Sequence, residues 1–309
     1  MPVDGPAADA NAARNAHREA GRRARWAGTR GELWALLAPH LTPGARVAVV
    51  GAGNGDDVPL GRIAAVASTV TLIDIDARTA GRARGRVRRG LRRRVRVLEH
   101  DVTLGAADRA VGEARHAADE AAAAPNAGVE VGPDTGTGAE TDPLPTSPTA
   151  TAPGRAPVPT ARAEPLPGGP YDLVVGDLLY SQLLYPALLD AGVPADVRRA
   201  TIDREGAALT RALVARLHAS APVVAHVHDR ACWGNGYPQP VELDAILDAA
   251  DDDPDDALAL ADRAKGPREA DPRAAIDALG LPVVATRLWH WPFVAGVDYL
   301  VVGTVAGGR

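Results

Sequence analysis

Three glycines at alternate positions, Gly51, Gly53 and Gly55, directly follow the short apolar run at residues 47–50. An unbroken run of small and β-branched residues is typical of a strand buried on both faces of a parallel sheet. Glycine permits positive φ and leaves no Cβ between the backbone and a ligand. We expect a helix over residues 57–65, and this strand, turn and helix N-terminus could receive the polar part of a nucleotide-like ligand.

An acid at the end of the next apolar run strengthens this interpretation. Residues 70–73 end at Asp74, which lies 23 residues after Gly51. That spacing is close to the one at which a carboxylate on the second strand accepts hydrogen bonds from ribose hydroxyls. The order of strand, glycines, helix, strand and acid therefore predicts a nucleotide site. The alternative is a tight turn between strand and helix that binds nothing.

The glycine segment and Asp74 resemble motifs I and II of the class I S-adenosylmethionine-dependent methyltransferases, and we expect a bacterial member of that family. A dinucleotide fingerprint would need its third glycine at position 56, which is Asp56. The resemblance therefore implies S-adenosyl-L-methionine as the cofactor. Many members carry an acid where this chain has Val49, and Asp56 or Asp57 could replace it. The predicted cofactor-binding segment comprises Gly51, Ala52, Gly53, Asn54 and Gly55.

The resemblance also implies how the rest of the cofactor is held. Ile75, which adjoins Asp74, belongs to the expected cofactor site. A third strand is predicted at residues 94–101, and Asp101 matches the acid that binds the adenine amino group in the family. Val102 would then pack on the adenine ring. The alternative role for Asp101 is that of a cap or turn residue.

Residues 171–180 resemble the fourth strand and motif IV, whose end lies beside the reactive methyl group in the family. Asp177 and Tyr180 are therefore the predicted catalytic residues, and Asp177 is also a predicted cofactor contact. The stretch Asp-Leu-Leu-Tyr resembles the Asp-Pro-Pro-Tyr motif of amino-group methyltransferases but lacks both prolines, so it identifies no acceptor. If a general base is used, the candidates are Asp177, Tyr180, His226 and His228.

His226 and His228 lie two residues apart on a predicted fifth strand, so both side chains would point to one face. They could form a metal-ligand pair together with Asp229. The sequence contains no further cluster with ligand spacing, and we predict no metal site.

Composition excludes several classes of protein. The net charge of −5 argues against a protein that coats nucleic acid, and we interpret nine arginines in residues 82–96 as a solvated helix face. The single cysteine, Cys232, rules out an internal disulfide framework and fits a cytoplasmic location. No apolar run approaches 18 residues, so no membrane span is predicted. We expect a small-molecule methyl acceptor rather than nucleic acid; the sequence does not predict the oligomeric state.

The alternation of strands and helices predicts an α/β protein with a Rossmann-like, doubly wound, mainly parallel seven-stranded sheet. We divide the chain into an N-terminal helical segment, residues 1–45, frayed up to about residue 10, and a methyltransferase-like domain, residues 46–309. The segment 125–170 is rich in Pro, Ala, Thr and Gly, and we predict a disordered insertion there. The acidic run 251–256 is expected to be a solvated loop.

A C-terminal antiparallel β-hairpin is predicted from two strand-like runs, residues 283–291 and 297–303, joined by a short loop. The class I fold ends in the same way. Trp289, Trp291 and Phe293 lie at the end of the first run. We expect these aromatic residues to cap the sheet, with a substrate-facing position as the alternative.

Three other functions remain open. A dinucleotide-dependent oxidoreductase could use the same kind of fold, although Asp56 disfavours it. The chain could also be a non-catalytic S-adenosylmethionine-binding domain, because Val49 and motif IV depart from the family pattern. A polyamine-forming aminopropyltransferase shares motif I but normally has paired acids after its fourth strand, where this chain has only Asp177.

Overall fold

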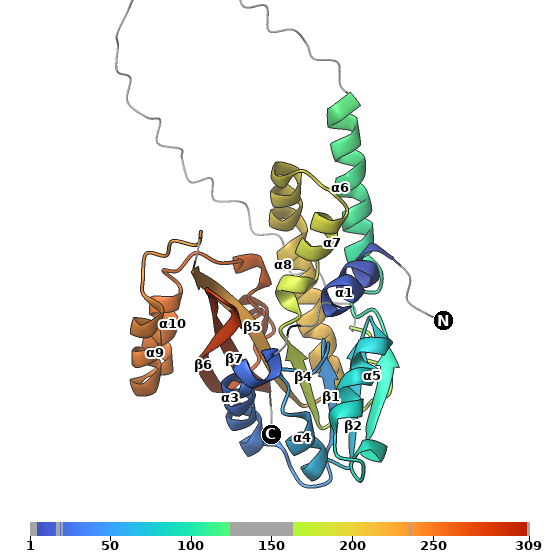
Figure 1. Cartoon of the computed structure of the whole chain (residues 1–309), viewed down its shortest axis with the longest axis vertical. Helices are drawn as coiled ribbons and strands as arrows, with labels where there is room; N and C mark the ends of the chain where they lie inside the picture. The colour runs from blue at the N-terminus through green and yellow to red at the C-terminus, as the bar shows by residue number, and fades with distance from the viewer. Residues whose placement is uncertain (1–4, 17–18, 20, 124–162, 235, 308–309) are drawn as a thin grey trace, which may run out of the picture.

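The computed structural model describes residues 5–16, 19, 21–123, 163–234 and 236–307, and its core is one seven-stranded sheet (Figure 1). The strand order is β3-β2-β1-β4-β5-β7-β6. Strands β1 to β5 pair in parallel with one another. Strand β7 pairs antiparallel with both β5 and β6. The predicted sheet and its C-terminal hairpin are thus confirmed. The strands are β1 Arg46–Val50, β2 Thr69–Asp74, β3 Val95–Glu99, β4 Leu173–Asp177, β5 Val223–Gly234, β6 Val283–Val294 and β7 Val297–Gly307.

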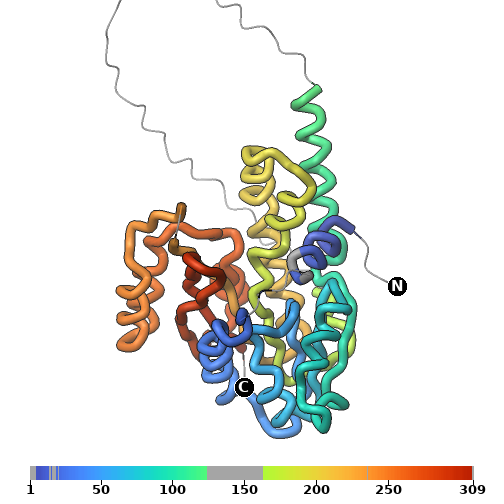
Figure 2. Tube along the Cα trace, in the orientation of Figure 1, coloured from blue at the N-terminus to red at the C-terminus, as the bar shows by residue number. Residues whose placement is uncertain are grey.

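Helices lie along the sheet and beyond its β6 edge, where α9 and α10 pack (Figures 1 and 2). The α-helices are α1 Pro6–Ala16, α2 Arg22–Arg25, α3 Ala27–Leu37, α4 Leu60–Val66, α5 Ala77–Arg86, α6 Ala106–Ala123, α7 Tyr185–Asp190, α8 Ala195–Ser220, α9 Leu243–Asp252, α10 Pro254–Ala261 and α11 Arg273–Ala278. Short 3-10 segments are η1 Ala38–His40, η2 Arg92–Arg94, η3 Tyr180–Gln182 and η4 Arg268–Ala270. The described residues contain no helix with the length and apolar content of a membrane span.

Alternate side chains of the central strand face two separate cores. Val47 and Val49 join the core that includes residues of α3, α4 and α5, whereas Ala48 and Val50 join the core that includes residues of α8 and α11. Because successive residues of a strand point to opposite faces, a strand covered by helices on both sides must be apolar throughout. The apolar run at residues 47–50 is therefore the direct signature of its central position.

Three local predictions were wrong. Residues 6–10 are not frayed: α1 begins at Pro6, and Ala10 is buried against α6 and α7, whereas residues 1–4 lie outside the described residues. Helix α4 begins at Leu60 rather than at residue 57, because Pro59 disfavours the helical conformation for the residue before it. The acidic run 251–256 ends one helix and starts the next, since the Asp253 carboxylate accepts a hydrogen bond from the Asp255 amide and caps α10.

The predicted insertion, residues 125–170, lies outside the described residues up to position 162. Its last part, residues 163–170, belongs to the packed structure and was wrongly included. Leu166 is buried, and its amide donates a hydrogen bond of 2.7 Å to the Ser220 hydroxyl at the end of α8. Tyr171 donates from its hydroxyl to the Pro167 carbonyl. These contacts hold the chain on α8 before it enters β4.

Candidate functional site

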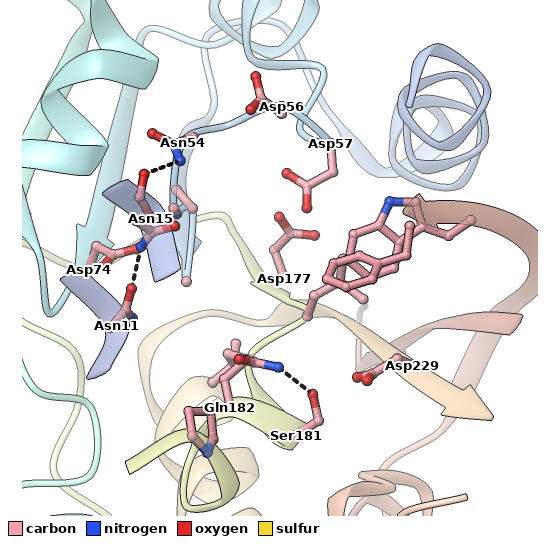
Figure 3. A pocket seen from close by; sticks show the side chains of 18 of the residues that line it. Asn11, Asn15, Asn54, Asp56, Asp57, Asp74, Asp177, Ser181, Gln182 and Asp229 are labelled. Carbon is pink, nitrogen blue, oxygen red and sulfur yellow. Dashed lines mark hydrogen bonds between the residues drawn. The ribbon is translucent and has the colours of Figure 1, made fainter. Parts of the chain in front are cut away.

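Two adjoining cavities lie at the carboxyl ends of the parallel strands. Figure 3 shows the larger one from close by. The order of the sheet reverses between β1 and β4, and ligands of open α/β sheets bind at such a switch point. The larger space, here the main cavity, has a volume of about 240 Å³. The smaller space, here the side cavity, has about 70 Å³. Gly51 and Asp74 line both, so the two cavities form one continuous site around the glycine loop.

Gly51 and Gly53 shape the wall of the main cavity. Gly51 has a φ of 79°, and a Cβ there would lie 2.9 Å from the Asp177 carbonyl oxygen. Gly53 has a φ of 46° and faces the helix α1, with its nearest neighbour the Asn15 side chain. Both positions use a left-handed backbone that favours glycine. The loop therefore turns sharply after β1 and keeps bare backbone at the cavity surface, as predicted from the sequence.

Gly55 has a different role from the one expected. Its φ is 61°, and a Cβ there would lie 2.9 Å from the Cβ of Ala83 on α5. It lines neither the main nor the side cavity. The missing side chain lets the loop pack against α5, so Gly55 supports the site without facing a ligand.

Asp74 lies at the end of β2 with only 3% of its surface exposed. Its Oδ2 accepts a hydrogen bond of 2.8 Å from the Gly53 amide, and its Oδ1 accepts one of 2.9 Å from the Asp76 amide. Burial raises the pKa of this carboxyl, and the two amides partly offset the rise. Each carboxylate oxygen can accept a second hydrogen bond. Asp74 thus holds the glycine loop and still offers acceptors to both cavities.

The side cavity contains the residues expected at the adenine end: Ile75, Asp101 and Val102 line it together. The Asp101 carboxylate accepts hydrogen bonds from the Thr103 amide and hydroxyl, at 2.8 and 2.7 Å, and from the Gly105 amide. The turn role that we named as an alternative is therefore present. Contact of Asp101 with a ligand remains a prediction.

Asp177 is the last residue of β4 and lines the main cavity. It is 2% exposed, and neither carboxylate oxygen has a hydrogen-bond partner among the described residues. Figure 3 shows its carboxylate pointing toward that of Asp57. Burial and the Asp57 charge raise the Asp177 pKa well above its ordinary value, and burial also raises the pKa of Asp57 to about 6. A buried carboxyl with a raised pKa can exchange a proton near neutral pH.

Tyr180, predicted as catalytic, does not reach this site. Its hydroxyl lies 2.5 Å from Nδ1 of His226, it packs in the core beside α8, and it lines neither cavity. Leu178 has a φ of 50°, so the chain reverses directly after Asp177 and turns the Tyr180 ring away from the cavities. We therefore withdraw the catalytic assignment of Tyr180.

The two histidines on β5 are also absent from the cavity walls. His226 is fully buried, with Nε2 3.0 Å from Nε2 of His218, and His228 is buried near the Asp271 carboxylate. Burial lowers the pKa of His228 to about 4 and that of His226 well below its ordinary value. Of the four candidate bases, only Asp177 lies in the site. No group of three potential ligands among the described residues is arranged to hold a metal ion.

Asp56 and Asp57, the two acids considered as replacements for the one absent at Val49, differ in their surroundings. Val49 is fully buried in the core. Asp56 is paired with Arg22 at 2.7 Å and with Arg86 at 2.6 Å, so its charge is neutralised. Asp57 lines the main cavity opposite Asp177. Asp56 borders the same cavity, and which of the two acids replaces the one absent at Val49 stays a prediction.

Several site residues were not predicted from the sequence. Asn11 and Asn15 of α1 line the main cavity, and the Asn15 carbonyl accepts a hydrogen bond of 3.0 Å from the Asn54 side chain. Asp229, on β5, lines the far side; from the sequence, we considered it only as part of a metal-ligand set. The two asparagines are four residues apart, which places them on one helix face, but nothing in their pattern connects them to the glycine loop.

An aromatic cluster closes the far side of the main cavity. The ring centroids of Trp26 and Trp291 are 4.9 Å apart, as are those of Trp291 and Phe293, and Tyr299 lies 5.3 Å from Phe293. All four line the main cavity. We expected Trp291 and Phe293 to cap the sheet, but both line the main cavity, which fits the alternative that we named; contact with a substrate stays a prediction. Trp289 is buried in the core, as a capping role requires.

The fold of this chain is similar to that of several solved structures. No protein-family model matches the chain, and no curated protein matches its sequence. Magnesium protoporphyrin IX methyltransferase from Synechocystis is 13% identical, with a TM-score of 0.40, covering 91% of this chain and 78% of its own. An N-methyltransferase from Bradyrhizobium japonicum is 13% identical, with a TM-score of 0.39, covering 98% and 99%. At these scores, the functional assignment rests on the site geometry alone.

Proposed function

We propose that this protein binds S-adenosyl-L-methionine and transfers its methyl group to a small-molecule acceptor. The observation that carries the proposal is the glycine loop, in which bare backbone at Gly51 and Gly53 borders a cavity whose other wall is Asp74. This arrangement stands at the switch point of the sheet, where a nucleotide-like ligand is expected.

The residues present fit this cofactor. The loop from Gly51 to Asn54 would hold its methionine and ribose part, and Asp74 with Ile75 would hold the ribose hydroxyls. Asp101 and Val102 would hold the adenine in the side cavity, which Ile73, Ile75 and Leu183 make largely apolar. The cavities are continuous at Gly51 and Asp74, as one elongated ligand requires.

S-adenosyl-L-methionine, when bound, supplies a methyl group that its sulfonium already activates. The chain then has to position the acceptor and exclude water. The aromatic cluster supplies an apolar wall for this purpose. Asp177, the one candidate base in the site, has free carboxylate oxygens that can accept a proton from the acceptor.

A thermal-shift and calorimetric titration with S-adenosylhomocysteine tests the cofactor. Ligand at 100 times its dissociation constant stabilises the fold by about 2.7 kcal/mol. We expect Asp74→Ala to weaken binding about 10- to 100-fold, because a charged hydrogen-bond acceptor is lost. Asp256→Ala, which removes an exposed carboxyl on α10, is the matched control. Binding of a reduced nicotinamide dinucleotide instead would favour an oxidoreductase, and cofactor binding without any methylated product would favour a non-catalytic domain.

We also propose that residues 1–45 act with the domain at 46–309, because α1 and Trp26 both contribute to the main cavity. A chain that begins at residue 46 should therefore fold less stably and bind S-adenosylhomocysteine more weakly. A cytoplasmic location is proposed from Cys232, which is half-buried and forms no disulfide. Cell fractionation would test the location.

A further inference from the structure

The main cavity continues past the glycine loop to a group of residues for which the cofactor has no evident use. We call Asp229 and the rings of Trp26, Trp291, Phe293 and Tyr299 the distal subsite. In the view of Figure 3, Asp177 lies between Asn54 of the glycine loop and Asp229. The distal subsite thus combines a carboxylate with an aromatic wall.

We propose that the distal subsite binds the positively charged nitrogen of an organic amine, and that this amine is the methyl acceptor. The second half of this inference rests on the proposed methyl transfer. The binding of a cation stands on the residues of the subsite alone.

The first argument is that the buried carboxyl groups of Asp177 and Asp229 are incompletely hydrogen-bonded. Asp177 and Asp229 are 2% and 8% exposed, and three of their four carboxylate oxygens have no hydrogen-bond partner among the described residues. No basic side chain in the described part of the chain forms an ion pair with either acid. A buried carboxylate without a partner is costly, so such groups are normally paired or hydrogen-bonded. A bound ammonium ion would supply the missing partner.

The second argument is the aromatic wall, which is independent of the acids. The faces of Trp and Tyr rings attract organic cations. The Arg22 guanidinium already lies 5.1 Å from the centroid of Trp26, so Trp291 and Tyr299 are the rings considered for a ligand. The Tyr299 hydroxyl has a raised pKa because of burial and the Asp229 charge, which shows that ring and carboxylate share one environment. A metal ion would call for additional oxygen ligands rather than for rings. Rings together with carboxylates therefore favour an organic ammonium.

The acids also account for the proton that an amine must lose. An ammonium nitrogen has no free electron pair, so one N–H bond must break before the nitrogen can act as a nucleophile. The proton passes to a carboxylate oxygen of Asp177, and the bonding pair remains on nitrogen as its lone pair. Asp177 is suited to this because neither of its oxygens has a partner among the described residues and because it lines the same cavity as the glycine loop and the distal subsite.

Binding of probe amines tests the proposal without measuring activity. The probes are 2-phenylethylamine, cyclohexylamine and 1,4-diaminobutane, each compared with the corresponding alcohol, in titrations followed by calorimetry and tryptophan fluorescence. We expect at least one amine to bind at least 10-fold more tightly than its alcohol. Asp229→Asn should remove that preference, while Asp256→Asn, on the exposed face of α10, should keep it. Magnesium chloride supplies an inorganic cation that is tested as a competitor of the amines.

S-adenosylhomocysteine binding is measured on the same samples and separates the two proposals. It also shows that Asp229→Asn is folded. If S-adenosylhomocysteine binds but no amine does, or if amines and alcohols bind equally, the cation subsite is refuted and the cofactor assignment stands. Retention of the amine preference in Asp229→Asn, or competition by magnesium at equal concentration, also refutes it. If an amine binds with the expected preference but S-adenosylhomocysteine does not, the subsite is confirmed and its role in methyl transfer is refuted.

Discussion

The carboxylates in the two halves of the main cavity differ in how completely they are hydrogen-bonded or ion-paired. Around the glycine loop, Asp74 accepts two backbone amides and Asp56 is paired with two arginines. Toward the distal subsite, Asp177 has no partner and Asp229 retains one free oxygen, among the described residues. The first half is complete before a ligand arrives. In the second half no described cation is ion-paired with Asp177 or Asp229, and this difference identifies the part of the site that still needs a partner.

The difference has a cost in stability. Satisfied acids hold the loop in one conformation, because their hydrogen bonds and ion pairs replace those lost to water. Unsatisfied buried acids destabilise the ligand-free fold, since their charged forms are poorly solvated. An Asp→Asn substitution should therefore lower the free energy of unfolding in the glycine-loop half and raise it toward the distal subsite.

The largest effect is expected from Gly51→Ala. The left-handed conformation and the 2.9 Å approach to the Asp177 carbonyl should together lower the free energy of unfolding by about 3 kcal/mol. Chemical denaturation measures this, and S-adenosylhomocysteine affinity should fall with it. Gly61→Ala is the control, because it lies in α4 with open space around it. It should have no effect or stabilise slightly, and equal losses in both variants would contradict our account of the loop.

Asp229→Asn should stabilise the ligand-free protein in a pH-dependent manner. Burial raises the Asp229 pKa from 3.8 to about 6, so its contribution to stability falls as pH rises through this window. A pKa difference of one unit corresponds to about 1.4 kcal/mol, so at pH 8 Asp229→Asn should raise the free energy of unfolding above that of the unsubstituted protein by at most about 3 kcal/mol. We expect a gain of about 2 kcal/mol. Below pH 3.8 both states are protonated and the gain should disappear. Thermal unfolding at pH 8 and pH 3.5 measures it; a loss of stability at pH 8 would contradict the prediction.

Asp56→Asn should have the opposite sign. It removes a carboxylate that neutralises Arg22 and Arg86, which are partly exposed, so we expect a loss of about 1 kcal/mol at low salt. Urea denaturation at low and high ionic strength measures this, with the loss becoming smaller in salt. If Asp56→Asn and Asp229→Asn changed stability in the same direction at pH 8, the contrast between the two halves would be wrong.

The smallest effect is expected where α1 meets the loop. Asn54→Ala removes the hydrogen bond to the Asn15 carbonyl, at a cost of about 1 kcal/mol. Amide hydrogen exchange should become faster in α1, while α11, which packs in a different hydrophobic cluster from α1, serves as the internal reference. Unchanged exchange in α1 would show that its packing on α6 and α7 is sufficient to hold it.

Much of the glycine-loop half could be predicted from the sequence, because its signals are local. The apolar run before Gly51, the need for positive φ and the distance to Asp74 all act within about one strand–helix–strand unit. Gly55 shows the limit of this reasoning, since only the approach of α5 distinguishes a packing glycine from a ligand-facing one. In the same way, Tyr180 matched a motif but was turned into the core by the reversal at Leu178.

The amino-acid sequence by itself determined the strand and helix pattern, the sheet that follows from it, and the glycine loop with Asp74. Tertiary structure alone decided the distal subsite, because it joins Trp26 to Trp291 and Asp229 from strands and helices far apart in the chain. It also decided that Asp177 is unpaired, since the number of partners around a buried carboxylate depends on every segment that packs near it. Periodicity and spacing carry information about backbone conformation, whereas the charge balance of a cavity is a property of the assembled fold.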